Sequence, residues 1–275
     1  MVTERRTMKR NVDELDISSF RNKFFNQKYV TKTVLKNFYT KVYKDLTDQA
    51  FRRILYGLEQ ERLIFSSGSG VFTIQDPQLS HCKPKIRFEP ILSPKLITVK
   101  EDILKAFPFI DSVIWETRII HDFMIHQPNV NMIILEVEKG IEESVFNHLN
   151  GSSLGPVFLA PDHTFVDRYV FQQPESIIVS KLVSRAPRGQ KGKLVQYAKM
   201  EKILIDLLVD QDRFYIYQGH ELSVIYENVF EKFLINEDSL LNYAKRRNAI
   251  EKLRTFIQNQ TKIELREFLE GLTNL

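Results

Sequence analysis

The segment TDQAFRRILYGLEQERLIFSSGSGVFTI (residues 47–74) predicts the fold of the N-terminal part of the chain. Thr47 can cap a helix that has Asp48 in its first turn, where the helix dipole favours a carboxylate. The apolar residues that follow at helical spacing are Phe51, Ile54, Leu55 and Leu58. Two short apolar runs, residues 63–65 and 71–74, then enclose the turn SSGSG and predict a β-hairpin, or wing.

Two more amphipathic helices are expected before this segment. The first contains Ile17, Phe20 and Phe24 at helical spacing, and the second follows a cap region at residues 31–33. Three helices followed by a hairpin are the element order of a winged helix-turn-helix, which places its third helix in the major groove of DNA. Residues 1–75 are therefore predicted to form a winged helix-turn-helix domain.

The third helix carries polar side chains opposite its apolar stripe. The residues predicted to read bases are Gln49, Arg52, Arg53 and Tyr56. The residues predicted to contact phosphates, on the second helix and the wing, are Lys32, Lys36, Ser67 and Ser69. Residues 1–75 hold 14 Lys and Arg against 8 Asp and Glu, a net +6, which agrees with a phosphate-binding surface. The alternative is a protein-interaction module whose arginines are only solvated.

Prolines interrupt residues 76–96, which predicts a linker. Residues 97–275 are predicted to form a mixed α/β domain that ends in helices, so the whole chain belongs to the α+β class. The helices expected first are 99–107 and 141–149, and the strands are 112–116, 132–137 and 157–160. Residues 118–126 are predicted as a helix, although their apolar residues also suit a strand. Apolar stripes after residue 200 indicate a helical bundle.

Composition excludes several classes of protein. No apolar run approaches the roughly 20 residues that cross a bilayer, so no membrane partner is expected. The basic start, MVTERRTMKR, is not followed by an apolar stretch, so a secretory signal is not expected. The single cysteine, Cys82, allows no internal disulfide, and with His81 alone it cannot build a zinc site. We expect a cytoplasmic protein with a real hydrophobic core.

No catalytic residue, metal or cofactor is predicted, because no complete motif for nucleotide binding, acyl transfer or zinc hydrolysis is present. The alternative function is a metal-dependent nuclease with a restriction-endonuclease-like middle domain. Its candidate carboxylates are Asp111, Glu116, Glu136 and Glu138. That motif needs a lysine two residues after an acid, whereas Lys139 follows Glu136 by three and Glu138 by one. In a strand, Lys139 would also face away from both glutamates.

Three segments resemble AbiE-type antitoxins of bacterial abortive-infection, or type IV toxin-antitoxin, systems. They are FMIHQPNVNMIILEVEKGIEESVFNHL (residues 123–149), KMEKILIDLLVDQDRFYIYQGHEL (199–222) and NYAKRRN (242–248). The resemblance spans most of residues 30–250. It implies a winged-helix regulator that binds double-stranded operator DNA, represses its own operon and opposes a separate nucleotidyltransferase-like toxin. No residue can be assigned to toxin contact in this way.

A basic stretch lies at residues 181–202. It contains Lys181, Arg185, Arg188, Lys191, Lys193, Lys199 and Lys202, relieved only by Glu201. With Gly189 and Gly192 in its middle, this stretch is predicted to contain a loop. Such a loop could contact nucleic acid or an acidic partner, or simply be solvated.

Overall fold

A computed structural model describes residues 17–25, 27, 29–43, 46–61, 63–68, 70–74, 85–189 and 195–265, without the side chains of residues 18, 67, 68 and 195. The chain divides into two compact units, Met1–Lys85 and Ile86–Leu275, which we describe separately. Helices and sheets occur in both units, so the α+β class is confirmed. None of the described helices is long and apolar enough to cross a membrane.

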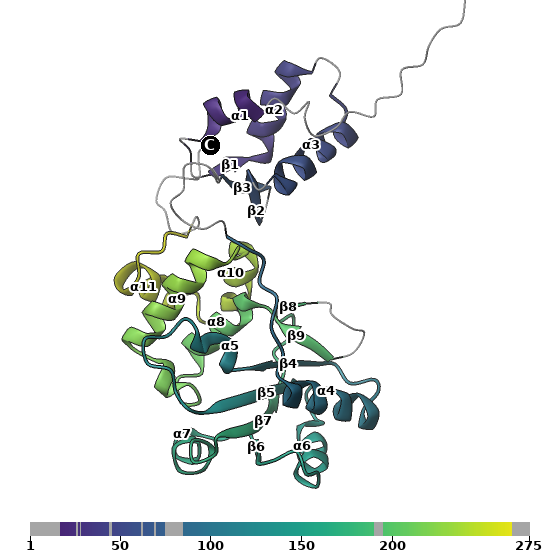
Figure 1. Ribbon diagram of the computed structural model, residues 1–275, viewed down its shortest axis with the longest axis vertical. Helices are drawn as coiled ribbons and strands as arrows, with labels where there is room; N and C mark the ends of the chain where they lie inside the picture. The colour runs from purple at the N-terminus through teal and green to yellow at the C-terminus, as the bar shows by residue number, and fades with distance from the viewer. Residues whose placement is uncertain are drawn as a thin grey trace, which may run out of the picture. The chain divides into compact units, whose positions relative to one another are not determined.

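The first unit contains the three predicted helices and the predicted hairpin (Figure 1). Its elements, in chain order, are α1 (Ile17–Phe24), β1 (Tyr29–Thr31), α2 (Lys32–Val42), α3 (Asp48–Gln60), β2 (Ile64–Gly68) and β3 (Val71–Ile74). The strands form an antiparallel sheet in the order β1-β3-β2. Strand β1 was not predicted, because three residues are too few to show a periodic pattern.

The core of the first unit is built from one face of each helix. Phe51 and Leu58 of α3 are buried against Leu35 and Tyr39 of α2, and Phe20 and Phe24 of α1 complete the cluster. Thr47 caps α3 as predicted, since its hydroxyl accepts a hydrogen bond of 3.2 Å from the amide of Ala50. Because the apolar stripe of α3 is used in this core, its polar face is left at the surface.

The second unit is organised around a mixed six-stranded sheet in the order β6-β7-β5-β4-β9-β8. The strands are β4 (Ser112–Glu116), β5 (Asn131–Val137), β6 (Val157–Leu159), β7 (Glu175–Lys181), β8 (Arg188–Gly189) and β9 (Val195–Ala198). Strands β4 and β5 are antiparallel, and their register pairs Ser112 with Val137. Strands β5 and β7 are parallel. The predicted strands in this unit are confirmed; β7, β8 and β9 were not predicted.

Helices cover both faces of this sheet. On one face of the sheet lie α4 (Pro94–Ala106) and α6 (Glu142–Asn150). On the opposite face lie α8 (Met200–Val209), α9 (His220–Lys232), α10 (Glu237–Arg246) and α11 (Ile250–Gln260). In β5, Ile134 points to the face with α8 and Ile133 to the face with α4. The sheet is therefore buried on both sides, which explains why its strands are apolar throughout.

Short helices occupy the connections. They are α5 (Arg118–His121), α7 (His163–Phe165), the π-helix η2 (Val166–Val170) and the 3-10 helix η3 (Tyr215–Tyr217). The predicted helix at residues 118–126 was wrong in length, because only its first four residues are helical. The rest of that segment turns away, with the amides of Ile125 and His126 bonded to the carboxylate of Glu221 on α9.

The second unit begins before residue 97, inside the stretch predicted as a linker. The amide of Ile86 donates to Lys232 at 3.0 Å, and the amide of Leu234 donates to Ile86 at 2.9 Å. Phe88 packs edge-on against Phe233, with ring centroids 5.2 Å apart. Residues 75–84, with His81 and Cys82, lie outside the described residues.

Removing the cap of α3 tests how the first unit starts its third helix. Thr47→Ala deletes the acceptor for the Ala50 amide, so the free energy of opening α3 should fall by about 1 kcal/mol. Native-state hydrogen exchange of the α3 amides measures this change. Thr47→Ser keeps the hydroxyl and should match the wild type. An equal loss in both variants would show that the cap contributes nothing.

Candidate functional site

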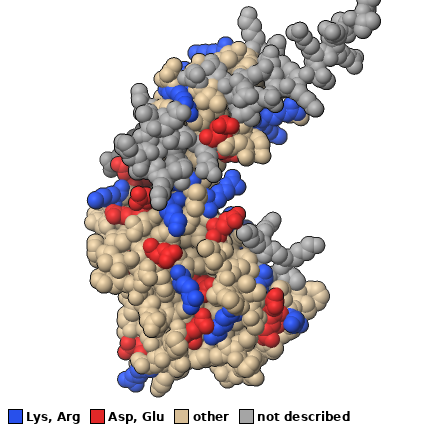
Figure 2. Space-filling view, in the orientation of Figure 1, with Lys and Arg blue, Asp and Glu red and all other residues tan. Residues whose placement is uncertain are grey.

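The polar face of α3 lies at the surface. Gln49, Arg52 and Arg53 are exposed, and Tyr56 is 63% exposed. At spacings of three, four and seven residues, these side chains share one side of the helix. Neither arginine has an ion pair or hydrogen bond within the described part of the chain. In Figure 2, Lys and Arg side chains gather over the part of the first unit where α3 lies.

A single acid, Asp48, lies among the cations of α2 and α3. Lys36 donates to its carboxylate at 2.8 Å, and the side chains are 46% and 78% exposed. The ion pair with Lys36 holds the pKa of Asp48 below its ordinary value, with smaller contributions from Arg52 and Lys32. Of the predicted DNA contacts, Lys36 therefore pairs with this carboxylate, whereas Lys32 and Arg52 act on it only through longer-range attraction.

The hairpin turn touches the start of α2. Lys32 donates its amide to the carbonyl of Gly70 at 2.6 Å, and Gly70 has a φ of +73°, a conformation that favours glycine. A Cβ added at Gly70 would lie 3.6 Å from the Cβ of Lys32. The backbone of the turn is thus tied to one predicted phosphate contact. The side chain of Ser67 and the whole of Ser69 lie outside what the structure describes, so these two contacts stay predictions.

The four carboxylates of the nuclease alternative are not brought together. Glu116 accepts bonds from the Ser93 amide and the Asn131 side chain, both at 2.9 Å, on the α4 side of the sheet. Glu136 points to the opposite face and pairs with Lys202. Asp111 and Glu138 are neighbours, since the Glu138 amide donates to the Asp111 carbonyl at 3.0 Å, but the Asp111 carboxylate pairs with Arg188 and Glu138 is exposed. Across the described ranges, no group of three or more His, Cys, Asp or Glu residues could hold a metal ion.

Glu136 belongs instead to a buried charge cluster between the sheet and the helices. Lys202 of α8 is 0% exposed and its ammonium contacts both Glu136 of β5 and Asp206 of α8. Asp206 also accepts from the Tyr243 hydroxyl and from Arg247, each at 2.9 Å. The other arm of the Arg247 guanidinium donates to Asp210 at 2.5 Å, at the end of α8.

Burial and charge oppose each other in this cluster. Burial raises the pKa of Glu136 above its ordinary value, and the nearby Lys202 offsets only part of that shift. Burial alone would lower the pKa of Lys202, but the charges of Asp206 and Glu136 outweigh it and raise that pKa. For Tyr243, burial and the charge of Asp206 raise the pKa of the phenol. Lys202 therefore keeps its proton at neutral pH, and the cluster is held as an ion-pair network.

This charge cluster was not predicted, although the sequence contains a signal for it. The segment MEKILIDLLV (residues 200–209) is apolar nearly all round, so it is typical of a buried helix. Lys202 and Asp206 are four residues apart on it and must meet within the interior. A lysine and an acid at that spacing in an otherwise apolar helix predict a buried ion pair.

A comparison with protein families places the chain. The sequence profile described as "Family of unknown function (DUF6577)" matches residues 50–263. The chain belongs to this family. The DUF6577 match begins inside α3 and covers the hairpin and nearly all of the described second unit. It includes Arg52, Arg53 and Tyr56 but stops short of Gln49 and α2. A comparison with curated proteins gives no match.

Replacing the central lysine tests the charge cluster. Lys202→Met keeps a long side chain but leaves Glu136 without its cation, so the unfolding free energy at pH 7 should fall by about 3–5 kcal/mol. Without the ammonium, the pKa of Glu136 stays above its unfolded value, so the folded state binds more protons. The deficit should therefore shrink as the pH falls from 7 towards 5.

Denaturant unfolding at several pH values measures both effects. The control is Lys199→Met, because Lys199 immediately precedes α8 and is exposed. A deficit of equal size in both variants, or one that is independent of pH, would contradict this account of the cluster.

Proposed function

We propose that the protein is a DNA-binding transcriptional regulator whose first unit is a winged helix-turn-helix. The element order α1-β1-α2-α3-β2-β3 and the sheet order β1-β3-β2 support this proposal. In such a module α3 enters the major groove, and the β2-β3 hairpin lies beside the phosphate backbone. Recognition by α3 needs no movement within the unit, because its apolar side is already used in the core.

The observation that carries the proposal is the pair of exposed guanidiniums on α3. Arg52 and Arg53 have no acid partner within the described residues, and each can form two hydrogen bonds with a guanine edge or a phosphate. Gln49 and Tyr56 lie on the same side of the helix and extend the reading surface. Lys32 and Lys36 add positive charge at the start of α2, where phosphates would lie.

The resemblance to AbiE-type antitoxins supports a more specific role. On that basis the regulator would act in the cytoplasm, repress its own operon and oppose a separate nucleotidyltransferase-like toxin. Contact with such a toxin would fall to the second unit, since the polar face of α3 would be occupied by DNA. The nuclease is not proposed, because Glu116 and Glu136 lie on opposite faces of one sheet.

Truncating the two arginines tests the reading surface. Arg52→Ala and Arg53→Ala should each weaken binding to the DNA upstream of the gene by about 1–3 kcal/mol, if each contacts a base. Gel-shift titration at a fixed salt concentration measures this. The control is Lys41→Ala, a substitution near the end of α2 on the side away from Lys32. If all three variants bind equally well, α3 does not read the DNA.

Neutralising the acid on this surface should act in the opposite direction. Asp48→Asn removes the carboxylate that pairs with Lys36 and attracts Arg52 and Lys32, so affinity for double-stranded DNA should rise a few-fold at low salt. The rise should shrink at higher salt, because exposed charges are then screened. Fluorescence anisotropy at two salt concentrations measures it. Glu61→Gln, at the far end of α3, makes the same change of charge and should have the smaller effect; equal effects would place the DNA elsewhere.

A further inference from the structure

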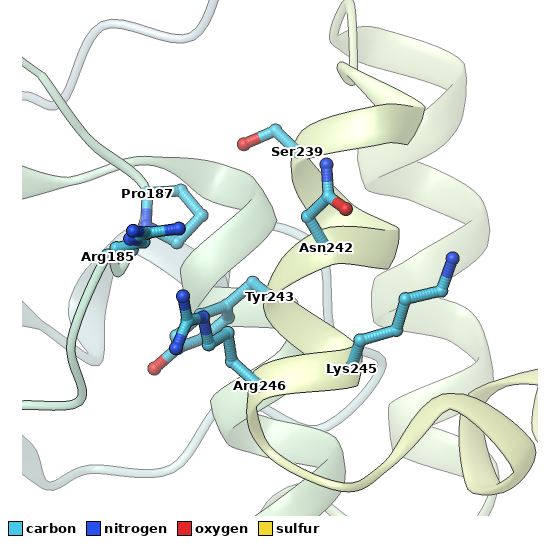
Figure 3. A pocket seen from close by; sticks show the side chains of 7 residues that line it. All are labelled: Arg185, Pro187, Ser239, Asn242, Tyr243, Lys245 and Arg246. Carbon is cyan, nitrogen blue, oxygen red and sulfur yellow. The ribbon is translucent and has the colours of Figure 1, made fainter.

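The second unit contains a basic cavity of about 600 Å³ beside α10 (Figure 3). One wall is the connection between β7 and β8, and the other is the exposed side of α10. The lining residues are Arg185, Pro187, Ser239, Asn242, Tyr243, Lys245 and Arg246. Three of these described lining residues are cations, and none of the seven is an acid.

Two arginines from different elements form the charged part of this cavity. Arg185 comes from the connection, whereas Arg246 comes from the last turn of α10. Figure 3 shows Arg185 and Arg246 on the same side of α10, whereas Lys245 extends away from them. No ion pair engages either arginine among the described residues. Two guanidiniums in one cavity repel each other, so an anion bound between them is favoured.

Two acids that lie behind the cavity lining are already engaged. Tyr243 forms part of the lining, and its hydroxyl donates inward to Asp206. Asp206 and Asp210 are both paired with Arg247, the neighbour of Arg246 that points to the interior. Asp206 and Asp210 are therefore neutralised by Arg247. Neither acid forms an ion pair with Arg185 or Arg246.

The backbone of Arg185 is held in an unfavourable conformation. Its φ is +58°, in the left-handed region that glycine adopts readily and a branched or long side chain does not. Strain of this kind persists where the surrounding structure enforces it, and it is concentrated at functional sites. A glycine would relieve the strain here but would remove the guanidinium from the cavity. The arginine at this position thus keeps a guanidinium in the cavity despite the strained backbone.

We propose that this cavity binds the phosphate groups of a small phosphorylated ligand. Arginine matches the oxygens of a phosphate with two parallel hydrogen bonds, and the two guanidiniums could engage adjacent phosphates. The Ser239 hydroxyl and the Asn242 amide add donors from α10. Two sources share this chemistry: a free nucleotide and the phosphorylated end of a nucleic acid. The inference does not depend on the proposed DNA-binding function, because the cavity lies in the second unit.

Isothermal titration calorimetry of the full chain with inorganic pyrophosphate tests this inference. Arg246→Ala should weaken pyrophosphate binding roughly tenfold or more, and Arg246→Lys should recover part of the affinity because it restores charge without the bidentate geometry. Arg185→Gly should lose affinity to a similar extent while its melting temperature is not lowered, because glycine suits the backbone there. The matched control is Lys105→Ala, an exposed cation in the last turn of α4, and it should bind as the wild type does.

Competition then identifies the source of the phosphate. Displacement of pyrophosphate by ATP but not by a short 5′-phosphorylated oligonucleotide supports a free nucleotide, and the reverse supports a nucleic-acid end. Absence of pyrophosphate binding at millimolar concentration would overturn the proposal, as would equal affinity in the wild type, Arg246→Ala and Arg185→Gly. Citrate binding as tightly as pyrophosphate would also overturn it, because it would show a general anion site. The Arg52→Ala variant should bind pyrophosphate as the wild type does, because Arg52 lies in the first unit. Failure of the DNA-binding proposal can therefore be told apart from failure of this one.

Discussion

The arrangement of the second unit depends on the ammonium of Lys202, which lies between the carboxylates of Glu136 and Asp206. Moving these charges out of water is costly, and their mutual attraction recovers the cost only when each keeps its partners. One contact ties α8 to the sheet through Glu136. Asp206 then ties α8 to α10 and the turn after it through Tyr243 and Arg247. These paired charges add directional contacts to the apolar packing of α8 against the sheet and α10.

The first unit is held together by a different interaction, the packing of aromatic and aliphatic side chains. Phe51 and Leu58 of α3 are buried in one apolar cluster with Leu35 and Tyr39 of α2. One helix can therefore serve two purposes, with an apolar side that holds the fold and a polar side that meets water or a ligand. The proposed DNA surface is thus independent of the core, and exposed cations can change there without loss of the fold.

Local patterns predicted the elements whose signal lies within one segment. The third helix, its Thr47 cap and strand Ser112–Glu116 are found where the sequence placed them. Strands β8 and β9 were missed because they are short and pair with residues far away in the chain, such as Ser112 with Val195. The same limit applies to the site. Exposure of Arg52 and Arg53 follows from helical spacing, but the partners of Glu136 and the cavity beside Arg185 depend on contacts between distant segments.

Sequence charge and surface charge also differ, and the basic stretch 181–202 shows why. Lys202 is buried between two carboxylates, Arg188 pairs with Asp111, and Arg185 lines a cavity to which none of the described acids contributes. In the run NYAKRRN, Arg247 turns inward to Asp206, whereas its neighbour Arg246 faces the cavity. Arg188, Arg247 and Lys202 are each neutralised by a carboxylate, whereas Arg185 and Arg246 have no ion pair among the described residues. Arg185, with a φ of +58° and no ion pair within the described residues, is therefore the cation of this stretch on which the proposed phosphate site depends.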